Sequence, residues 1–257
     1  MKNTFSITDS LNMGYDMLKR RFGAIMLLVV ITVVSELFFQ YAITTFLLLF
    51  GPWTSVIAKL LSNVVNTFFG LALLLKMIAL YDDTNTDLSV DSFFSTVKKD
   101  MFIRYVITSL LYGVIVALPI FIFGGIGVLI KLYVIDQLAD PSSPLIILLA
   151  VIYLVACSIV VIHLIMRFLL APFFIADEIT KSPVEALKLS AKACKKNVGH
   201  LSLFALAIIA VSILGVILFL IGILFVYPII IIATVHVYRS LAHKNMEFNN
   251  VIIEEVE

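Results

Sequence analysis

Four polar side chains lie within long apolar segments, where ionisable groups are costly and mark candidate functional sites. Glu36 and Gln40 are one helical turn apart in the first such segment, and Asn63 and Asn66 lie in the second. If the two segments pair as antiparallel helices, the four side chains approach one another. This polar cluster has two interpretations: Glu36 carries a proton or binds a cation, or it is protonated, hydrogen-bonded to an Asn, and fixes helix pairing.

A second candidate set is basic. Arginine presents a donor fork that suits phosphate, and lysines near a membrane surface attract anionic headgroups. The alternative is that these residues only set the topology of the chain. The predicted headgroup contacts are Arg167, Lys188, Lys192, Lys195, Lys196 and Arg239.

No other pattern in the sequence indicates reaction chemistry. No Ser-His-Asp or Cys-His arrangement suggests itself, and no His, Cys or carboxylate cluster has metal-ligand spacing. We therefore expect no catalytic residue, no metal and no cofactor, and we predict that the protein is not an enzyme.

The composition indicates that these side chains belong to a membrane protein. The chain has 257 residues, of which 62% are hydrophobic and 14% charged, whereas soluble domains are about 45–50% apolar and about 25% charged. The net charge of +1 gives no bulk basic excess that would indicate nucleic acid as a partner. An all-α integral membrane protein follows.

Six segments are long enough to cross a hydrocarbon core of about 30 Å, which needs about 20 apolar residues. Turns are predicted at 51–53, at 136–144 and near Gly222. Residues 201–241 would span about 60 Å as one helix, twice that thickness, so a hairpin near Gly222 is preferred. The predicted spans are 23–46, 55–80, 103–129, 144–170, 201–219 and 224–241.

The distribution of basic residues orients the spans. If both termini and the loops after the second and fourth spans share one side, that side holds all of the 18 Lys and Arg residues except Lys59 and Lys131. Positive charge accumulates in cytoplasmic loops, so both termini are predicted to be cytoplasmic.

A polar segment introduces each pair of spans. The stretch "ITDSLNMGYDMLKRRFG" near the start resembles "SPVEALKLSAKACKKNVGH" at 182–200, and "LSVDSFFSTVKKDMFIRYV" from residue 88 is a looser third copy. The pattern predicts three repeats, approximately 5–82, 88–175 and 182–241, in one membrane domain 1–257 with a short polar tail at 242–257. Each repeat is an amphipathic helix in the cytoplasmic interface followed by a hairpin.

Local signals define how two of these interfacial helices begin. Ser182 is a predicted N-cap followed by Pro183 and, three residues after the cap, Glu185, while Ser89 is a predicted cap in the third copy. Helical spacing places five residues of the second copy on one apolar face: Val184, Leu187, Ala191, Cys194 and Val198.

The C-terminal half resembles a group of bacterial six-span inner-membrane proteins. The group includes the membrane domain fused to some glycerophosphodiester phosphodiesterases and similar uncharacterised families. The resemblance implies six helices in the bacterial cytoplasmic membrane and no activity, because the phosphodiesterase is a separate soluble barrel. The positions that support it are Arg167, Pro172, Asp177, Pro183, Ala186, Leu187, Ser190, Gly222, Pro228, Tyr238 and Arg239.

Two functions fit these observations. The first is a non-enzymatic protein that organises or handles membrane lipids, with phospholipids as partners and a homo-oligomer or a membrane-protein partner as open options. The second is a small transporter or channel that uses Glu36, in which Pro119 and Pro228 could break helices to form a site.

Overall fold

The computed structural model describes residues 5–130, 132, 144–217 and 221–254. Lys131, residues 136–143 of the second predicted turn and residues 255–257 of the predicted tail lie outside the described residues. Within the described part, every regular element is a helix. The helices are α1 (Ile7–Arg20), α2 (Phe22–Leu48), the 3-10 turn η1 (Pro52–Thr54), α3 (Ser55–Asp82), α4 (Val90–Ser95), α5 (Lys99–Ile130), α6 (Pro144–Phe168), α7 (Ala171–Ala176), α8 (Pro183–Cys194), α9 (Val198–Ile217) and α10 (Ile221–Glu254).

Six of the described helices are long and apolar enough to cross a membrane, as the sequence predicts. They occur as three pairs of neighbours in contact, α2 with α3, α5 with α6 and α9 with α10. Two helices replace one long helix in this region, as expected: α9 ends at Ile217 and α10 begins at Ile221, and a Cβ on Gly215 would lie 3.3 Å from the Gly222 backbone. Residues 218–220, where the chain passes from one to the other, lie outside the described residues.

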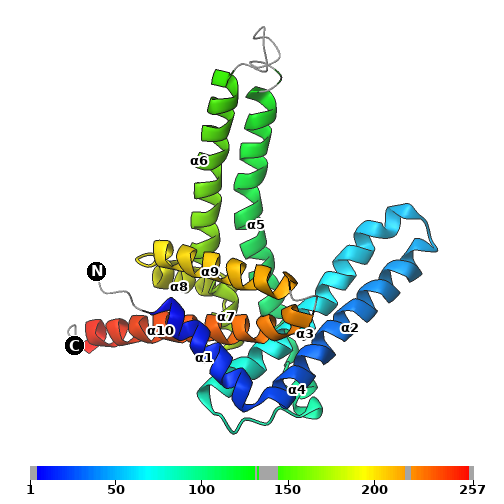
Figure 1. Cartoon of the computed structure of the whole chain (residues 1–257), viewed down its shortest axis with the longest axis vertical. Helices are drawn as coiled ribbons and strands as arrows, with labels where there is room; N and C mark the ends of the chain where they lie inside the picture. The colour runs from blue at the N-terminus through cyan, green and yellow to red at the C-terminus, as the bar shows by residue number, and fades with distance from the viewer. Residues whose placement is uncertain (1–4, 131, 133–143, 218–220, 255–257) are drawn as a thin grey trace.

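The three pairs diverge from a shared base (Figure 1). The α5/α6 pair projects away from the other helices, the α2/α3 pair leans in another direction, and the α9/α10 pair lies across the base. Burial follows this arrangement. In the most apolar 18-residue stretch of α3, 56% of the residues are buried, whereas none are buried in the corresponding stretches of α5 and of the span Leu145–Ala176.

Helix α10 connects the parts of this base. It contacts α1, α2, α3, α8 and α9. Ile232 and Val235 belong to a buried cluster with the inner halves of α2 and α3, whereas Val237 and Leu241 belong to a second cluster with α8 and α9. The two hydrophobic cores therefore meet on opposite sides of one helix.

Both α5 and α10 continue through their prolines, Pro119 and Pro228. The breaks considered at these positions are therefore not observed, in keeping with the tolerance of membrane helices for proline. The backbone of α10 also stays helical through residues 243–254, which belong to the predicted polar tail.

A helix precedes each long pair: α1, α4 and α8. The predicted caps are confirmed, since Ser182 Oγ accepts a hydrogen bond from the Glu185 N–H and Ser89 Oγ accepts one from the Ser92 N–H. Helix α4 is short, and Lys99 begins the long helix α5 instead of preceding it.

The buried face of α8 is turned relative to the predicted one. Leu187 and Cys194 are buried as expected, but Val184 is 53% exposed. Three small side chains, Ala186, Ser190 and Ala193, complete the buried face. Close packing against neighbouring helices favours small residues, which hydropathy alone ranks below valine.

Helix α1 packs against α10 through a similarly small residue. Gly14 is buried, and a Cβ added there would lie 2.5 Å from the carbonyl oxygen of Ile229. The two backbones thus approach more closely than any side chain would permit.

Replacing Gly14 with Ala should therefore push α1 away from α10 and destabilise the protein by about 1–3 kcal/mol, as overpacking does. Thermal unfolding of the detergent-solubilised protein measures this change. Gly23→Ala is the matched control: in the described structure no atom beyond its own helical turn lies within 4 Å of the added Cβ, so the higher helix propensity of alanine should leave stability equal or greater. Equal behaviour of the two variants would contradict the close contact.

Candidate functional site

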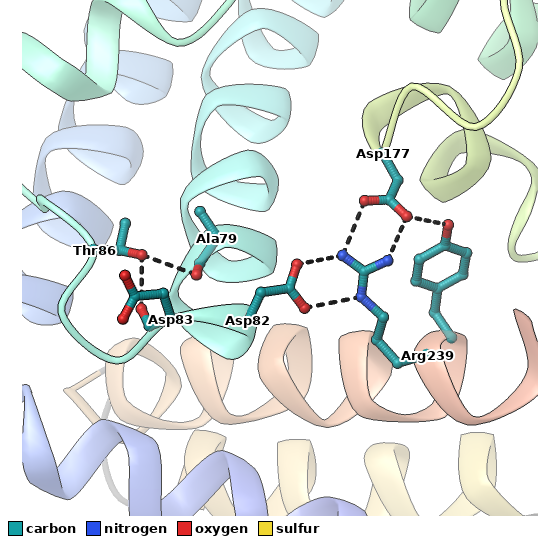
Figure 2. A network of polar contacts seen from close by, with 7 residues as sticks. Ala79, Asp82, Asp83, Thr86, Asp177 and Arg239 are labelled. Carbon is teal, nitrogen blue, oxygen red and sulfur yellow. Dashed lines mark hydrogen bonds and ion pairs between the residues drawn. The ribbon is translucent and has the colours of Figure 1, made fainter. Parts of the chain in front are cut away.

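The main polar site lies at the base, where α10 passes the ends of α3 and α7. Arg239 of α10 pairs with two carboxylates, Asp82 and Asp177 (Figure 2). Tyr238 donates its hydroxyl hydrogen to Asp177 Oδ2 at 2.8 Å. Each of the three long pairs, or the segment that directly follows it, therefore contributes to one ionic cluster.

The guanidinium of Arg239 contacts both carboxylates in a two-pronged geometry. Nε donates to Asp82 Oδ1 at 3.1 Å and Nη2 donates to Asp82 Oδ2. Nη1 donates to Asp177 Oδ2 at 2.5 Å, and Nη2 also donates to Asp177 Oδ1 at 2.9 Å. These contacts use four of the five guanidinium N–H groups. Such fork-shaped pairs combine charge with directional hydrogen bonding.

The two carboxylates occupy positions that an isolated helix disfavours. Asp82 is the last residue of α3, and Asp177 caps the end of α7. The C-terminal end of a helix carries partial negative charge, so an acidic side chain there is unfavourable unless a cation lies nearby. Arg239 supplies that cation to both helix ends.

The two ion pairs differ in exposure. The side chains of Arg239 and Asp177 are each 14% exposed, whereas that of Asp82 is 49% exposed. The Asp177 pair is therefore shielded from water and sensitive to the loss of one partner, and the Asp82 pair is partly solvated.

The segment that follows α3 is held in place by hydrogen bonds from Thr86 and Arg21. Thr86 donates its hydroxyl hydrogen to the carbonyls of Ala79 and Asp83 (Figure 2). Arg21 donates to the carbonyl oxygens of Thr84 and Thr86 at 3.1 and 2.9 Å. These contacts fix the position at which α3 ends and hence the position of Asp82.

The remainder of this segment leads into α4. Lys76 Nζ donates to the backbone carbonyl of Asp87 at 3.2 Å. The backbone N–H and the hydroxyl of Ser89 both donate to the Asp87 carboxylate, and these bonds lower the pKa of that carboxyl. Asp87 is thus held in its charged form beside the start of α4.

Helix α8 is joined to the end of α6 through a buried serine. The Leu170 N–H donates to Ser190 Oγ at 3.2 Å, and Ser190 Oγ donates to the Arg167 carbonyl at 3.1 Å. Glu185 accepts the Thr180 hydroxyl hydrogen at 2.5 Å. Burial raises the pKa of the Cys194 thiol to about 12, so this side chain stays protonated at neutral pH.

The predicted polar cluster is only partly drawn together. Glu36 is partly buried, whereas Gln40 and Asn63 are exposed. Asn66 Oδ1 is buried and has no hydrogen-bond partner within the part of the chain that the structure describes. Among the residues that the structure describes, no hydrogen bond joins any two of Glu36, Gln40, Asn63 and Asn66.

The predicted headgroup residues fall into two environments. Lys188, Lys192, Lys195 and Lys196 are exposed on α8 and in the turn that follows it. Arg239 is paired within the protein, whereas Arg167 has a buried Nε with no hydrogen-bond partner in the described part of the chain.

From the sequence, Arg239 was predicted to contact lipid headgroups and Asp177 was named only for the family resemblance. Their pairing was not predicted, and Asp82 was not named. One signal was present: an arginine within an otherwise apolar helix requires a carboxylate or a route to the surface. Asp82 and Asp177 both end apolar segments, which made them available as partners. Which acidic residues pair with Arg239 depends on how the helix pairs cross, and the sequence does not show that.

Six helices that are long and apolar enough to cross a membrane define, by length and hydropathy, a multi-pass membrane protein. The chain belongs to the family described as "Protein of unknown function (DUF975)", which matches residues 8–245. No curated protein and no solved structure matches the chain.

Substituting Asp177 with Asn should destabilise the protein by about 3–5 kcal/mol, because it leaves the largely buried Arg239 charge undercompensated. Asp82→Asn removes the same charge at a half-exposed position and should cost about 0–1 kcal/mol. Thermal unfolding of both variants in the same detergent compares them directly. A cost for Asp82→Asn equal to that for Asp177→Asn would show that burial does not govern the cluster.

Proposed function

We propose that this protein is a non-enzymatic component of the bacterial cytoplasmic membrane that organises or handles lipids and binds anionic phospholipids through α8 and the adjoining end of α6. The observation that carries the proposal is the contrast between two arginines. Arg239 is compensated by two carboxylates, while Arg167 has a buried nitrogen without a partner in the described structure. Nε itself is out of a headgroup's reach, so an anionic headgroup would bind at the terminal nitrogens of the same guanidinium, which are not among the buried unpartnered atoms.

The lysines of α8 extend this basic surface. Lys188, Lys192 and Lys195 follow one another at helical spacing, with Lys196 adjacent, and all four are exposed. A basic residue near an anionic membrane surface contributes about 1 kcal/mol of attraction. Because Arg239 is already paired within the protein, the proposal does not depend on it.

The proposed membrane placement follows the repeats. Helices α1, α4 and α8 each precede one long pair, and in this proposal they lie in the cytoplasmic interface with both termini on the same side. The likeness to the membrane domains fused to glycerophosphodiester phosphodiesterases is consistent with such a role and brings no activity with it. A homo-oligomer or a membrane-protein partner is compatible with the large exposed apolar surface.

Replacing Lys188, Lys192, Lys195 and Lys196 together with Gln should weaken binding to anionic lipid by roughly fivefold per residue, at about 1 kcal/mol each. Retention of phosphatidylglycerol after detergent extraction, compared with phosphatidylcholine, measures the effect.

Lys59→Gln is the control, because Lys59 lies near the opposite end of α3 from the base and is exposed. A folded fourfold variant that retains as much phosphatidylglycerol as the parent protein would refute lipid binding through α8. A further control is salt, which should weaken binding of the parent protein and have less effect on the variant.

A transporter or channel that uses Glu36 is the second candidate. One observation favours it: Ser62 Oγ and Asn66 Oδ1, one turn apart on α3, are both buried and have no hydrogen-bond partner among the described residues. Buried unpaired oxygens are uncommon and are satisfied in other proteins by waters or ions. The continuity of α5 and α10 through their prolines argues against a site built from broken helices.

If Glu36 couples transport, Glu36→Gln should abolish proton- or cation-dependent flux into vesicles containing the purified protein, because glutamine cannot exchange a proton. Gln40→Ala is the control, since Gln40 is exposed. Flux that is unaffected by Glu36→Gln would exclude this residue from the mechanism.

A further inference from the structure

Helix α10 touches one end of the α2/α3 pair at two points that are far apart along its own length. Near the start of α10, Phe225 stacks on Phe22, the first residue of α2, with ring centroids 5.7 Å apart. Further along α10, Arg239 pairs with Asp82, the last residue of α3. Phe225 and Arg239 lie about 21 Å apart along the helix axis, at about 1.5 Å per residue.

Phe22 and Asp82 lie at the same level of the α2/α3 pair. Helix α2 begins where α3 ends, because the turn that joins them is at the opposite end of the pair. Arg21, beside Phe22, donates to the carbonyl oxygens of Thr84 and Thr86, just after Asp82. A helix that meets this one level at two points about 21 Å apart runs across the pair and not along it. Figure 1 shows this course, with α10 lying across the base.

Helix α1 indicates the same orientation of α10. Gly14 of α1 meets the backbone of Ile229, which lies about 4.5 Å along the axis from the centre of the apolar stretch Gly222–Ala242. The next turns of α1 carry three exposed charged side chains, Asp16, Lys19 and Arg20. If α10 crossed the bilayer, Gly14 would lie near the midplane and these charges would lie in hydrocarbon, where ionised side chains are costly. If α10 lies along the membrane boundary, all three reach headgroups or water.

The α5/α6 pair is joined to α10 at the same base. Asp177, directly after the apolar stretch Leu145–Ala176, also pairs with Arg239. Both the α2/α3 pair and the α5/α6 pair extend upward from α10 in Figure 1. A bilayer that contains these two pairs therefore has α10 near one of its surfaces.

We propose that the α9/α10 pair does not cross the bilayer but lies within the leaflet at the base, in contact with the acyl chains of that leaflet. The membrane is then crossed four times, by α2, α3, α5 and the span Leu145–Ala176. The leaflet at the base is the predicted cytoplasmic one, because three basic residues precede α2 at this end, Lys19, Arg20 and Arg21.

Helix α9 supplies the surface that contacts the acyl chains. It packs on α10 and on α6, and residues 201–217 contain no charged side chain. The hydroxyls of Ser202 and Ser212 donate to carbonyls of the same helix. Such a surface is stable in hydrocarbon and costly in water. Five large apolar side chains of α9 are more than half exposed: Leu203, Leu206, Ile213, Leu214 and Ile217.

The distribution of basic residues does not distinguish four crossings from six. No Lys or Arg lies between Leu201 and Tyr238 in the sequence, and a hairpin that enters a leaflet and returns leaves both termini on one side. Length and hydropathy count α9 and α10 as spans, but an apolar hairpin within a leaflet satisfies the same two criteria. The contacts of α10 with Phe22, Gly14 and Asp82 separate the two placements.

Nitroxide labels on single cysteines test the proposal, because the accessibility of a label to oxygen and to a water-soluble nickel complex reports its depth in lipid vesicles. The background carries Cys157→Ala and Cys194→Ala. The labelled α9 variants are Leu203→Cys, Ile209→Cys and Ile217→Cys, and the matched controls on the crossing helix α5 are Ile107→Cys and Val114→Cys; all five positions are exposed.

We expect the three α9 labels to lie at the same depth. On α5, Val114→Cys should lie about 10 Å deeper than Ile107→Cys, at about 1.5 Å per residue. If α9 crossed the bilayer, Ile209→Cys would lie about 9 Å deeper than Leu203→Cys, and that result would overturn the proposal.

Labelling of intact cells with a membrane-impermeant maleimide gives a second measurement that needs no reconstitution. Trp53→Cys should react from outside, because Trp53 is 70% exposed at the end of the α2/α3 pair opposite the base, whereas Ile217→Cys should not. Reaction of both variants from outside would equally overturn the proposal. The placement does not depend on lipid binding through α8, so the fourfold lysine variant should give the same depths and the same labelling even if it retains all of its phosphatidylglycerol.

Discussion

The pairing of Arg239 with Asp82 and Asp177 is the constraint on which the arrangement of the helices depends. Each carboxylate ends a helix at a position that electrostatics disfavours, and both become favourable only when α10 crosses at the level of Arg239. The hydrophobic contacts around α10 are plentiful but have little directional preference. The forked hydrogen bonds select one crossing among the many that would bury similar area.

The molecule is closely packed around α10, whereas the α2/α3 and α5/α6 pairs extend away from this base (Figure 1). Buried side chains concentrate on α10 and on the inner halves of α2 and α3, while the outer part of α5 and the apolar part of α6 are exposed. In a bilayer, lipid chains are as apolar as leucine, so exposed limbs carry no hydrophobic penalty.

Much of this fold could be read from the sequence because its signals are local. Hydropathy located the six spans, and the Ser182-Pro183 pair located the start of α8. The ionic cluster could not be found in this way, since its partners lie 157 and 62 residues apart. The buried face of α8 was partly misjudged for a related reason: Ala186 and Ala193 are buried because neighbours approach closely, which a pattern based on side-chain hydrophobicity does not register.

The position of Arg239 in the chain has a consequence for biosynthesis. Asp82 and Asp177 are synthesised long before residue 239 of the 257 emerges. Until then, the ends of α3 and α7 carry uncompensated negative charge, and the contacts of α3 with α5 and α7 lack the support of α10. The protein therefore completes its fold only when its last long helix arrives, and a chain that stops before that point presents two acidic helix ends to the machinery that removes unfinished membrane proteins.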